Sequence, residues 1–259
     1  TLIYTSGTTG RPKGVMLTHH NIISNVKSLE RGDFFQINPR DKVLSFLPMC
    51  HIYERTNIYL YLFYGVSIYY AENLDTVAEN IREVKPAMFA TVPRLLEKVY
   101  DKVLAKGNEL TGIKRSLFFA AIDFGLKYDP MEKLGFLDKI KLAIFRKLIF
   151  SKWQEALGGN IRAITSGSAA LQPRLSRIFW AADIPIAEGY GLTETTAGAT
   201  LNLTSAHRVG SVGKPIPGTT IKIAEDGEVL IKGPIVMQGY WQNDAANKEV
   251  FDSNGYFKS

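Results

Sequence analysis

Short apolar segments alternate with amphipathic ones over residues 1–200, and this alternation constrains the fold more than any other feature of the sequence. Buried strands are expected at 87–92, 161–167 and 184–191, and helices are expected to begin at Pro93 and Pro173, after the first two strands. A parallel neighbour can be reached only through a crossover connection, which is usually a helix. We therefore predict an α/β domain with a largely parallel sheet flanked by helices.

The segment before residue 75 is expected to contain further elements of this kind. Residues 1–5 read as a strand, residues 6–17 as a loop, and Thr18 can cap a helix with Gly32 beyond its end. The uncharged run 56–71 is rich in tyrosine and interrupted by a glycine. That run predicts a buried helix followed by a strand rather than a membrane span.

The pattern changes after residue 200. The stretch TIKIAEDGEVLIKG alternates apolar and polar residues on both sides of an Asp-Gly pair, which is a strong hairpin signal. We therefore expect two regions, an α/β region at 1–200 and a small β-rich subdomain at 201–259 that is truncated at its end.

Composition excludes several classes of protein. The chain has 259 residues, 46% of them hydrophobic, which is enough for a large core. Its one cysteine, Cys50, excludes an internal disulfide framework and suits a reducing compartment. The net charge of +6 permits an anionic ligand or an acidic membrane surface. The sequence contains no basic motif with interleaved aromatic residues, which is the pattern typical of nucleic-acid binding.

The stretch YTSGTTGRPKG, residues 4–14, has the composition of a phosphate-binding loop. Glycines allow backbone amides to approach an anion, and the hydroxyls and lysine add further donors. A P-loop would need glycine at position 12 and serine or threonine at 14, but the chain has Pro12 and Gly14. A phosphate loop of another type is therefore expected, and a surface loop without a ligand is the alternative.

Three motifs occur in an order that resembles one enzyme family. YTSGTTGRPKG, ITSGSAAL (164–171) and EGYGLTET (188–195) are similar to the signature motifs of the acyl-adenylate-forming enzymes, also called the AMP-binding or ANL superfamily. Within it, LPMCHIYERT (47–56) and a helical insertion at about 107–150 are most similar to the long-chain fatty-acid–CoA ligases (AMP-forming). The chain resembles a fragment of the large N-terminal domain, lacking the N-terminal part and the C-terminal domain.

The resemblance implies a two-step reaction that uses ATP, Mg²⁺ and coenzyme A. A long-chain fatty acid would be converted to an acyl-adenylate and then to acyl-CoA, so that residues 1–200 would form a nucleotide- and acyl-binding region. Positioning and charge stabilisation would be the main task of the protein in such phosphoryl chemistry. The isolated chain is expected to bind nucleotide weakly and to be catalytically incomplete, because the family's ribose-binding Asp and C-terminal Lys are absent from it.

The resemblance also assigns roles to residues. Glu194 would ligate magnesium, Thr193 would donate to the α-phosphate, and His51 would border the acyl carboxylate; a buried core histidine is the alternative for His51. Tyr190 would lie against one face of adenine, and Gly191 would also belong to the nucleotide site. The phosphate loop would comprise Thr5, Ser6, Gly7, Thr8, Thr9, Gly10 and Lys13, and the opposite adenine wall Gly167, Ser168, Ala169 and Ala170. Ser168 and Ala170 depart from the glycine and proline of many relatives.

Two other functions remain open at this point. One is an adenylating enzyme with another acceptor, such as the thiol of a carrier protein. The other is a non-catalytic module that binds nucleotide or lipid.

The insertion contains an amphipathic segment. Four apolar residues share one helical face, with two basic residues roughly opposite: Leu137, Ile140, Ile144 and Leu148, against Lys139 and Arg146. We favour a surface helix packed on the domain, and a helix lying on an anionic membrane is the alternative. The expected location is cytoplasmic, with peripheral contact to the membrane as an open alternative.

Overall fold

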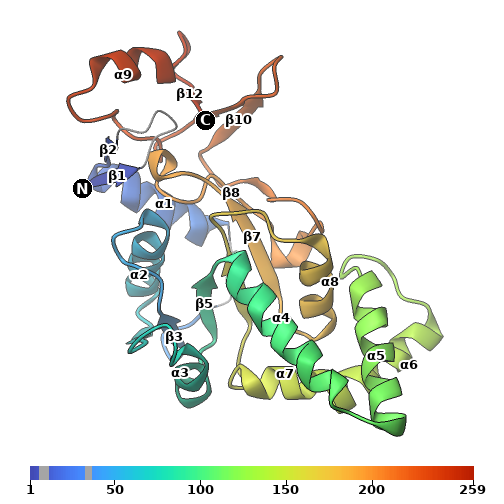
Figure 1. The fold of residues 1–259 in the computed structure, drawn as a ribbon. Helices are drawn as coiled ribbons and strands as arrows, with labels where there is room; N and C mark the ends of the chain where they lie inside the picture. Colours follow the sequence, from blue (N-terminus) through green and yellow to red (C-terminus); the bar gives the residue numbers. More distant parts are fainter. Residues whose placement is uncertain (6–11, 33–36) are drawn as a thin grey trace.

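The computed structural model describes residues 1–5, 12–32 and 37–259. Within them, a seven-stranded sheet has the order β4-β3-β5-β6-β7-β8-β9 (Figure 1). Strands β4, β3, β5, β6 and β7 pair in parallel, whereas β8 and β9 are antiparallel. The bounds are β3 Lys42–Ser45, β4 Ser67–Tyr70, β5 Met88–Thr91, β6 Ala163–Ser166, β7 Ile186–Tyr190, β8 Thr200–Leu201 and β9 Lys214–Pro215. The predicted α/β fold with a largely parallel sheet is confirmed.

Helices cover both faces of this sheet (Figure 1). Those that begin at Pro93 and Pro173 were predicted and are confirmed. The helices are α1 His19–Arg31, α2 Ile52–Tyr64, α3 Val77–Val84, α4 Pro93–Asn108, α5 Gly112–Lys127, α6 Phe136–Phe145, the π-helical turn η1 Arg146–Phe150, α7 Ser151–Ala156, α8 Pro173–Ala181 and α9 Asp244–Val250.

Alternation along the strands divides the core into two clusters. Val43 and Met88 pack on one face with apolar residues of α1 and α2. Their neighbours Leu44 and Phe89 pack on the other face with residues of α3 to α8. Successive side chains of a strand point to opposite faces, and both faces are covered here. The central strands therefore carry apolar side chains on both faces, and buried polar side chains such as Ser45 and Ser166 come at their carboxyl ends.

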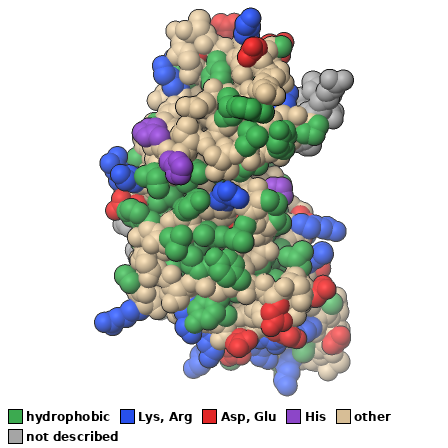
Figure 2. Space-filling view, turned by 90° about the vertical axis from the view of Figure 1, so that its left-hand side faces the viewer, with side chains coloured by type: hydrophobic (Ala, Val, Ile, Leu, Met, Phe, Trp, Pro, Cys, Tyr) green, Lys and Arg blue, Asp and Glu red, His purple; other side chains and the backbone are tan. Residues whose placement is uncertain are grey.

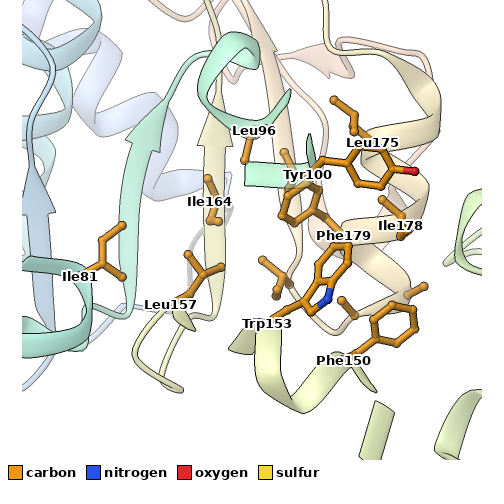
Figure 3. Close-up of a cluster of buried hydrophobic side chains, with 14 of the residues drawn as sticks. Ile81, Leu96, Tyr100, Phe150, Trp153, Leu157, Ile164, Leu175, Ile178 and Phe179 are labelled. Carbon is orange, nitrogen blue, oxygen red and sulfur yellow. The ribbon is translucent and has the colours of Figure 1, made fainter. Parts of the chain in front are cut away.

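Aromatic side chains join the helices of the second cluster (Figure 3). The Trp153 ring from α7 lies with its centroid 5.6 Å from that of Phe150, 5.7 Å from that of Phe179 and 6.5 Å from that of Tyr100. Tilted and edge-on contacts of this kind are the favoured geometries for aromatic pairs. Trp153 thereby ties α4 and α8 to the end of the insertion.

The N-terminal segment departs in part from expectation. Strand β2, Lys13–Met16, pairs antiparallel with β1, Leu2–Thr5, so the loop predicted for 6–17 is wrong over its last residues. The cap at Thr18 is confirmed, because its Oγ1 accepts a hydrogen bond from the amide of Asn21 at 3.0 Å.

The C-terminal part contains a three-stranded antiparallel sheet. Strands β10 (Thr220–Ile223) and β11 (Val229–Lys232) form the predicted hairpin, and β12 (Phe257–Lys258) pairs with β11. Gly227 in the turn has φ +92°, a conformation that favours glycine. Strand β9 still belongs to the large sheet although it follows residue 200. The division into 1–200 and 201–259 stays a prediction.

Helix α2 is buried on its inner side only. It contributes Leu60 and Tyr61 to the core, whereas Tyr59, Leu62 and Phe63 are exposed. Hydrophobic side chains gather on the face of the molecule that is turned left in Figure 1 (Figure 2), where α1 and α2 lie. Among the described residues, no helix combines the length and the apolar character needed to cross a bilayer.

Candidate active site

A cavity of about 580 Å³ opens between α1, α2 and the carboxyl ends of the parallel strands. This size is typical of small-molecule pockets, and this edge is where open α/β sheets bind ligands. The cavity brings together six of the residues that the sequence singled out: His51, Gly167, Ser168, Tyr190, Gly191 and Thr193.

The turn after β7 is held in an uncommon conformation. The 3₁₀ turn η2, Thr193–Thr195, is followed by Thr196 and Ala197 with φ of 55° and 75°. Non-glycine residues adopt such angles at a cost, so surrounding contacts must hold them there. The amide of Leu192 donates to Thr195 Oγ1 at 2.9 Å, and Thr196 Oγ1 donates to the Ile235 carbonyl at 2.6 Å. These bonds fix where Thr193 enters the cavity.

Glu194 is held at both its backbone and its side chain. Its carbonyl accepts a hydrogen bond from the Met237 amide, and its Oε1 accepts one from Tyr240 Oη, each at 2.8 Å. Burial, followed by the hydrogen bond to Glu194 and its charge, raises the pKa of Tyr240. The phenol therefore stays protonated and remains the donor to the carboxylate.

Tyr240 also connects Glu194 with the end of the phosphate loop. Lys13 Nζ lies 5.1 Å from the centroid of the Tyr240 ring, within the range of a cation–π contact. Backbone hydrogen bonds hold β2 beside this segment, from the Met16 amide to the Gly239 carbonyl and from the Trp241 amide to the Gly14 carbonyl. Lys13 and Glu194 are thereby brought to the same tyrosine from segments far apart in the chain.

The rest of the phosphate loop can be placed only at its ends. Thr5 is the register partner of Lys13 at the end of the β1–β2 pair where the chain passes from one strand to the other. The predicted residues Ser6, Gly7, Thr8, Thr9 and Gly10 lie outside the described residues.

Sequence reasoning did not single out Tyr240. The available signal was its position in GYWQND, a stretch similar to a family segment. Its role depends on contact with Glu194, 46 positions away.

The carboxylate of Glu194 suits a magnesium ion that is held mainly by phosphates. Within the described part of the chain, no group of three or more His, Cys, Asp or Glu side chains could hold a metal by itself. Mg²⁺ commonly takes one or two carboxylates and fills its remaining positions with water and phosphate oxygens. The residues present therefore fit a nucleotide-bound ion rather than a cage made by protein alone.

The predicted adenine walls are the ends of two neighbouring strands. Gly167 follows β6, and a Cβ atom there would lie 3.2 Å from Tyr53 Cζ, so this glycine permits close packing against α2. Tyr190 ends β7, and its hydroxyl donates to Ser259 Oγ at 3.0 Å. Ser168, with φ 70°, lines the cavity, whereas Ala169 and Ala170 are exposed and do not line it.

His51 precedes α2 and occupies its N-cap position. Its amide donates to the Pro48 carbonyl at 3.0 Å, and its side chain is exposed at the cavity. The alternative of a buried core histidine is therefore wrong.

A buried carboxyl group in α2 also lines the cavity, and sequence reasoning missed it. Glu54 is 1% exposed and accepts a hydrogen bond from Ser45 Oγ. Burial raises its pKa from the ordinary value of 4.5 to about 7, and the Ser45 bond opposes this rise. Glu188 in β7 has its pKa raised to about 7 for the same main reason.

We expect Glu54→Gln to reduce the loss of stability between about pH 4.5 and pH 7. In that window the folded chain keeps the Glu54 proton while the unfolded chain releases it, so the free energy of unfolding falls as pH rises. The full effect of a shift of this size is about 3 kcal/mol. Urea denaturation across the pH range measures it, with the exposed Glu225→Gln as the matched control. Equal pH profiles for the two variants would contradict the assignment.

Comparisons with known proteins agree on one family. The family model described as AMP-binding enzyme matches residues 1–241. The long-chain-fatty-acid–CoA ligase FadD15 of Mycobacterium bovis is 36% identical over 262 residues, covering 100% of this chain and 43% of that protein. The human long-chain-fatty-acid–CoA ligase 1 is 34% identical, covering 98% of this chain and 38% of that protein.

Solved structures show the same fold. The N-terminal domain of FACL13 from Mycobacterium tuberculosis aligns with a TM-score of 0.69 and 25% identity, covering 100% of this chain and 55% of that one. The o-succinylbenzoate coenzyme A synthetase of Bacillus subtilis in complex with AMP aligns with a TM-score of 0.71 and 25% identity, covering 100% of this chain and 45% of that one. The chain thus spans less than half the length of the curated relatives it matches here.

Proposed function

Because this chain belongs to the AMP-binding enzyme family, we propose that the whole protein uses ATP to activate a long-chain fatty acid, first to an acyl-adenylate and then to acyl-CoA. The proposal draws on the ligase names of the relatives and on one geometric observation. Tyr240 contacts both Lys13 and Glu194, and Glu194 directly follows Thr193, which lines the cavity. A cation, a carboxylate and a hydroxyl near one cavity edge are the groups that a metal-bound triphosphate needs.

The first step is an attack by a fatty-acid carboxylate oxygen on the α-phosphorus of ATP. The bond from that phosphorus to its bridging oxygen breaks, and pyrophosphate leaves with the bridging oxygen. Lys13 neutralises phosphate charge, and Thr193 donates a hydrogen bond to the α-phosphate. A magnesium ion held by Glu194 would supply further charge stabilisation. These residues act by positioning and electrostatics, which dominate phosphoryl-transfer catalysis.

The second step transfers the acyl group to coenzyme A. The thiolate sulfur attacks the acyl carbon, the bond from that carbon to the phosphate oxygen breaks, and AMP leaves. The thiol proton has by then passed to solvent. His51 borders the carboxyl end of the substrate in this arrangement.

The rest of the cavity accepts the hydrocarbon chain. Its wall includes five aliphatic side chains: Leu29, Leu47, Ile52, Val92 and Leu201. Burial of each methylene group contributes about 0.8 kcal/mol. Longer acyl chains should therefore bind more tightly until the cavity is full.

The test is pyrophosphate release by the full-length protein with fatty acids of increasing length. We expect release that requires fatty acid, rises from short to long chains, and yields acyl-CoA once coenzyme A is added. Release that is independent of fatty acid would contradict the proposal. Acyl transfer to a carrier-protein thiol instead of coenzyme A would contradict the proposed acceptor of the second step and leave the proposed first step unchanged.

A further inference from the structure

Helix α6 and the turn η1 expose a row of large apolar side chains. Phe136, Leu137, Ile140, Ile144 and Leu148 are each between 43% and 78% exposed. The last four are spaced by three or four residues, which places them on one helical face. We call these five side chains the apolar ridge.

The apolar ridge is not the face through which the helix packs. Leu142 and Phe145 are buried, and the Phe145 ring centroid lies 5.6 Å from that of Phe124 in α5. Arg146 Nε donates to the Ala181 carbonyl of α8 at 2.9 Å. The helix does pack on the domain, as favoured from the sequence, but through a neighbouring side that carries Leu142 and Phe145. It is therefore apolar on two faces, and an exposed apolar face of this kind marks an interaction surface.

The charge around the apolar ridge indicates what it contacts. Residues 133–152 contain one acidic residue, Asp138, whose Oδ1 lies 3.1 Å from Lys141 Nζ. The same segment contains six basic residues, of which all except Arg146 are exposed: Lys133, Lys139, Lys141, Arg146, Lys147 and Lys152. Helix α2 also exposes apolar side chains, yet its thirteen residues include one basic residue, Arg55. Unlike α2, α6 and η1 combine an exposed apolar row with a strongly basic border.

We propose that the apolar ridge docks on the surface of an anionic lipid bilayer. Its apolar side chains enter the boundary between headgroups and acyl chains, and the neighbouring lysines contact anionic headgroups. Helices α5 and α6 lie on the side of the molecule away from α1 and α2, which wall the cavity (Figure 1). Docking through the apolar ridge therefore leaves the cavity uncovered. This surface is independent of the proposed reaction, and binding is measured without turnover.

Co-sedimentation of the 259-residue chain with lipid vesicles tests this docking. We expect binding to vesicles that contain phosphatidylglycerol, weakened by salt, and much less binding to pure phosphatidylcholine. The triple variant Leu137→Ser, Ile140→Ser, Ile144→Ser should bind at least ~10-fold more weakly, because the apolar side chains no longer insert into the bilayer. Replacing Lys141 and Lys147, which lie beside the apolar ridge, by Gln should weaken binding to anionic vesicles by about fivefold per lysine. All these side chains are exposed, so thermal melting should be unchanged.

The matched control carries Leu62→Ser and Phe63→Ser on α2 and should bind as the parent chain does. No binding to anionic vesicles, or binding that is lost in the α2 variant and kept in the ridge variant, would overturn the proposal. Sedimentation without lipid supplies a further test. A dimer that the ridge variant abolishes would assign the apolar ridge to a second copy of this chain instead.

Discussion

Replacing Gly191 by alanine is expected to abolish ATP binding and to lower the free energy of unfolding by about 3 kcal/mol. A Cβ atom at this position would lie 1.5 Å from the Ala197 carbonyl oxygen and 2.6 Å from its carbonyl carbon. Both are backbone atoms of the turn that carries Thr193 and Glu194, so no side-chain rotation relieves the clash. The turn has to move, and the two side chains leave their positions at the cavity.

Gly198→Ala is the matched control, because it adds the same methyl group in the same loop. No atom lies within 4 Å of the Cβ position at Gly198, so its free energy of unfolding should stay within about 0.5 kcal/mol of the parent value. Urea denaturation measures the free energy, and calorimetry with ATP and magnesium measures binding. If the two alanine variants behave alike, the close approach of Gly191 to the turn does not hold Thr193 and Glu194 in place.

Glu194→Gln is expected to slow pyrophosphate release by the full-length protein by about 10²- to 10³-fold. Glutamine keeps the size of the side chain and an oxygen that can accept the hydrogen bond from Tyr240, but it removes the negative charge. Magnesium prefers a charged oxygen ligand, so the variant should lose affinity for ATP mainly when magnesium is present. Calorimetry with ATP, with and without magnesium, separates this effect from a general loss of nucleotide binding.

Tyr240→Phe provides the comparison for this experiment. It removes the hydroxyl group while it keeps the ring beside Lys13 and the charge of Glu194. A loss smaller than that of Glu194→Gln is expected, because the carboxylate loses an orienting donor but not its role as a ligand. Unchanged magnesium-dependent affinity in Glu194→Gln would refute the assignment of Glu194.

The elements that the sequence located well depend on local pattern. Strands β5 and β6 lie within the predicted segments 87–92 and 161–167, and the next helices begin at Pro93 and Pro173 as predicted. An apolar run predicts a buried strand, and a proline after it predicts the first turn of a helix. Both predictions use only neighbouring residues, so they require no knowledge of distant contacts.

The part of the predicted loop that proved to be a strand depends on distant contacts. Lys13–Met16 pairs with β1 on one side, and its residues exchange backbone hydrogen bonds with Gly239 and Trp241 on the other. More than 220 positions separate these segments. Glycine and lysine have low β-strand propensity, so the local sequence of this segment could not indicate a strand.

The candidate site divides in the same way. Motif order placed Thr193, Glu194 and Tyr190 in one short stretch, and the structure places that stretch at the cavity edge. Tyr240 and Glu54 could be recognised only in the tertiary structure. Tyr240 contacts Glu194, 46 positions away, and Glu54 is almost completely shielded from solvent.

The sequence by itself determined the alternation of strands and helices, the positions of the turns and the order of the motifs, because periodicity and turn residues act over a few neighbouring positions. The tertiary structure alone decided that Tyr240 stands between Lys13 and Glu194 and that α6 packs through Leu142 and Phe145. A helix with two apolar faces can bury either one, and packing against α5 and α8 selects which face remains in solvent.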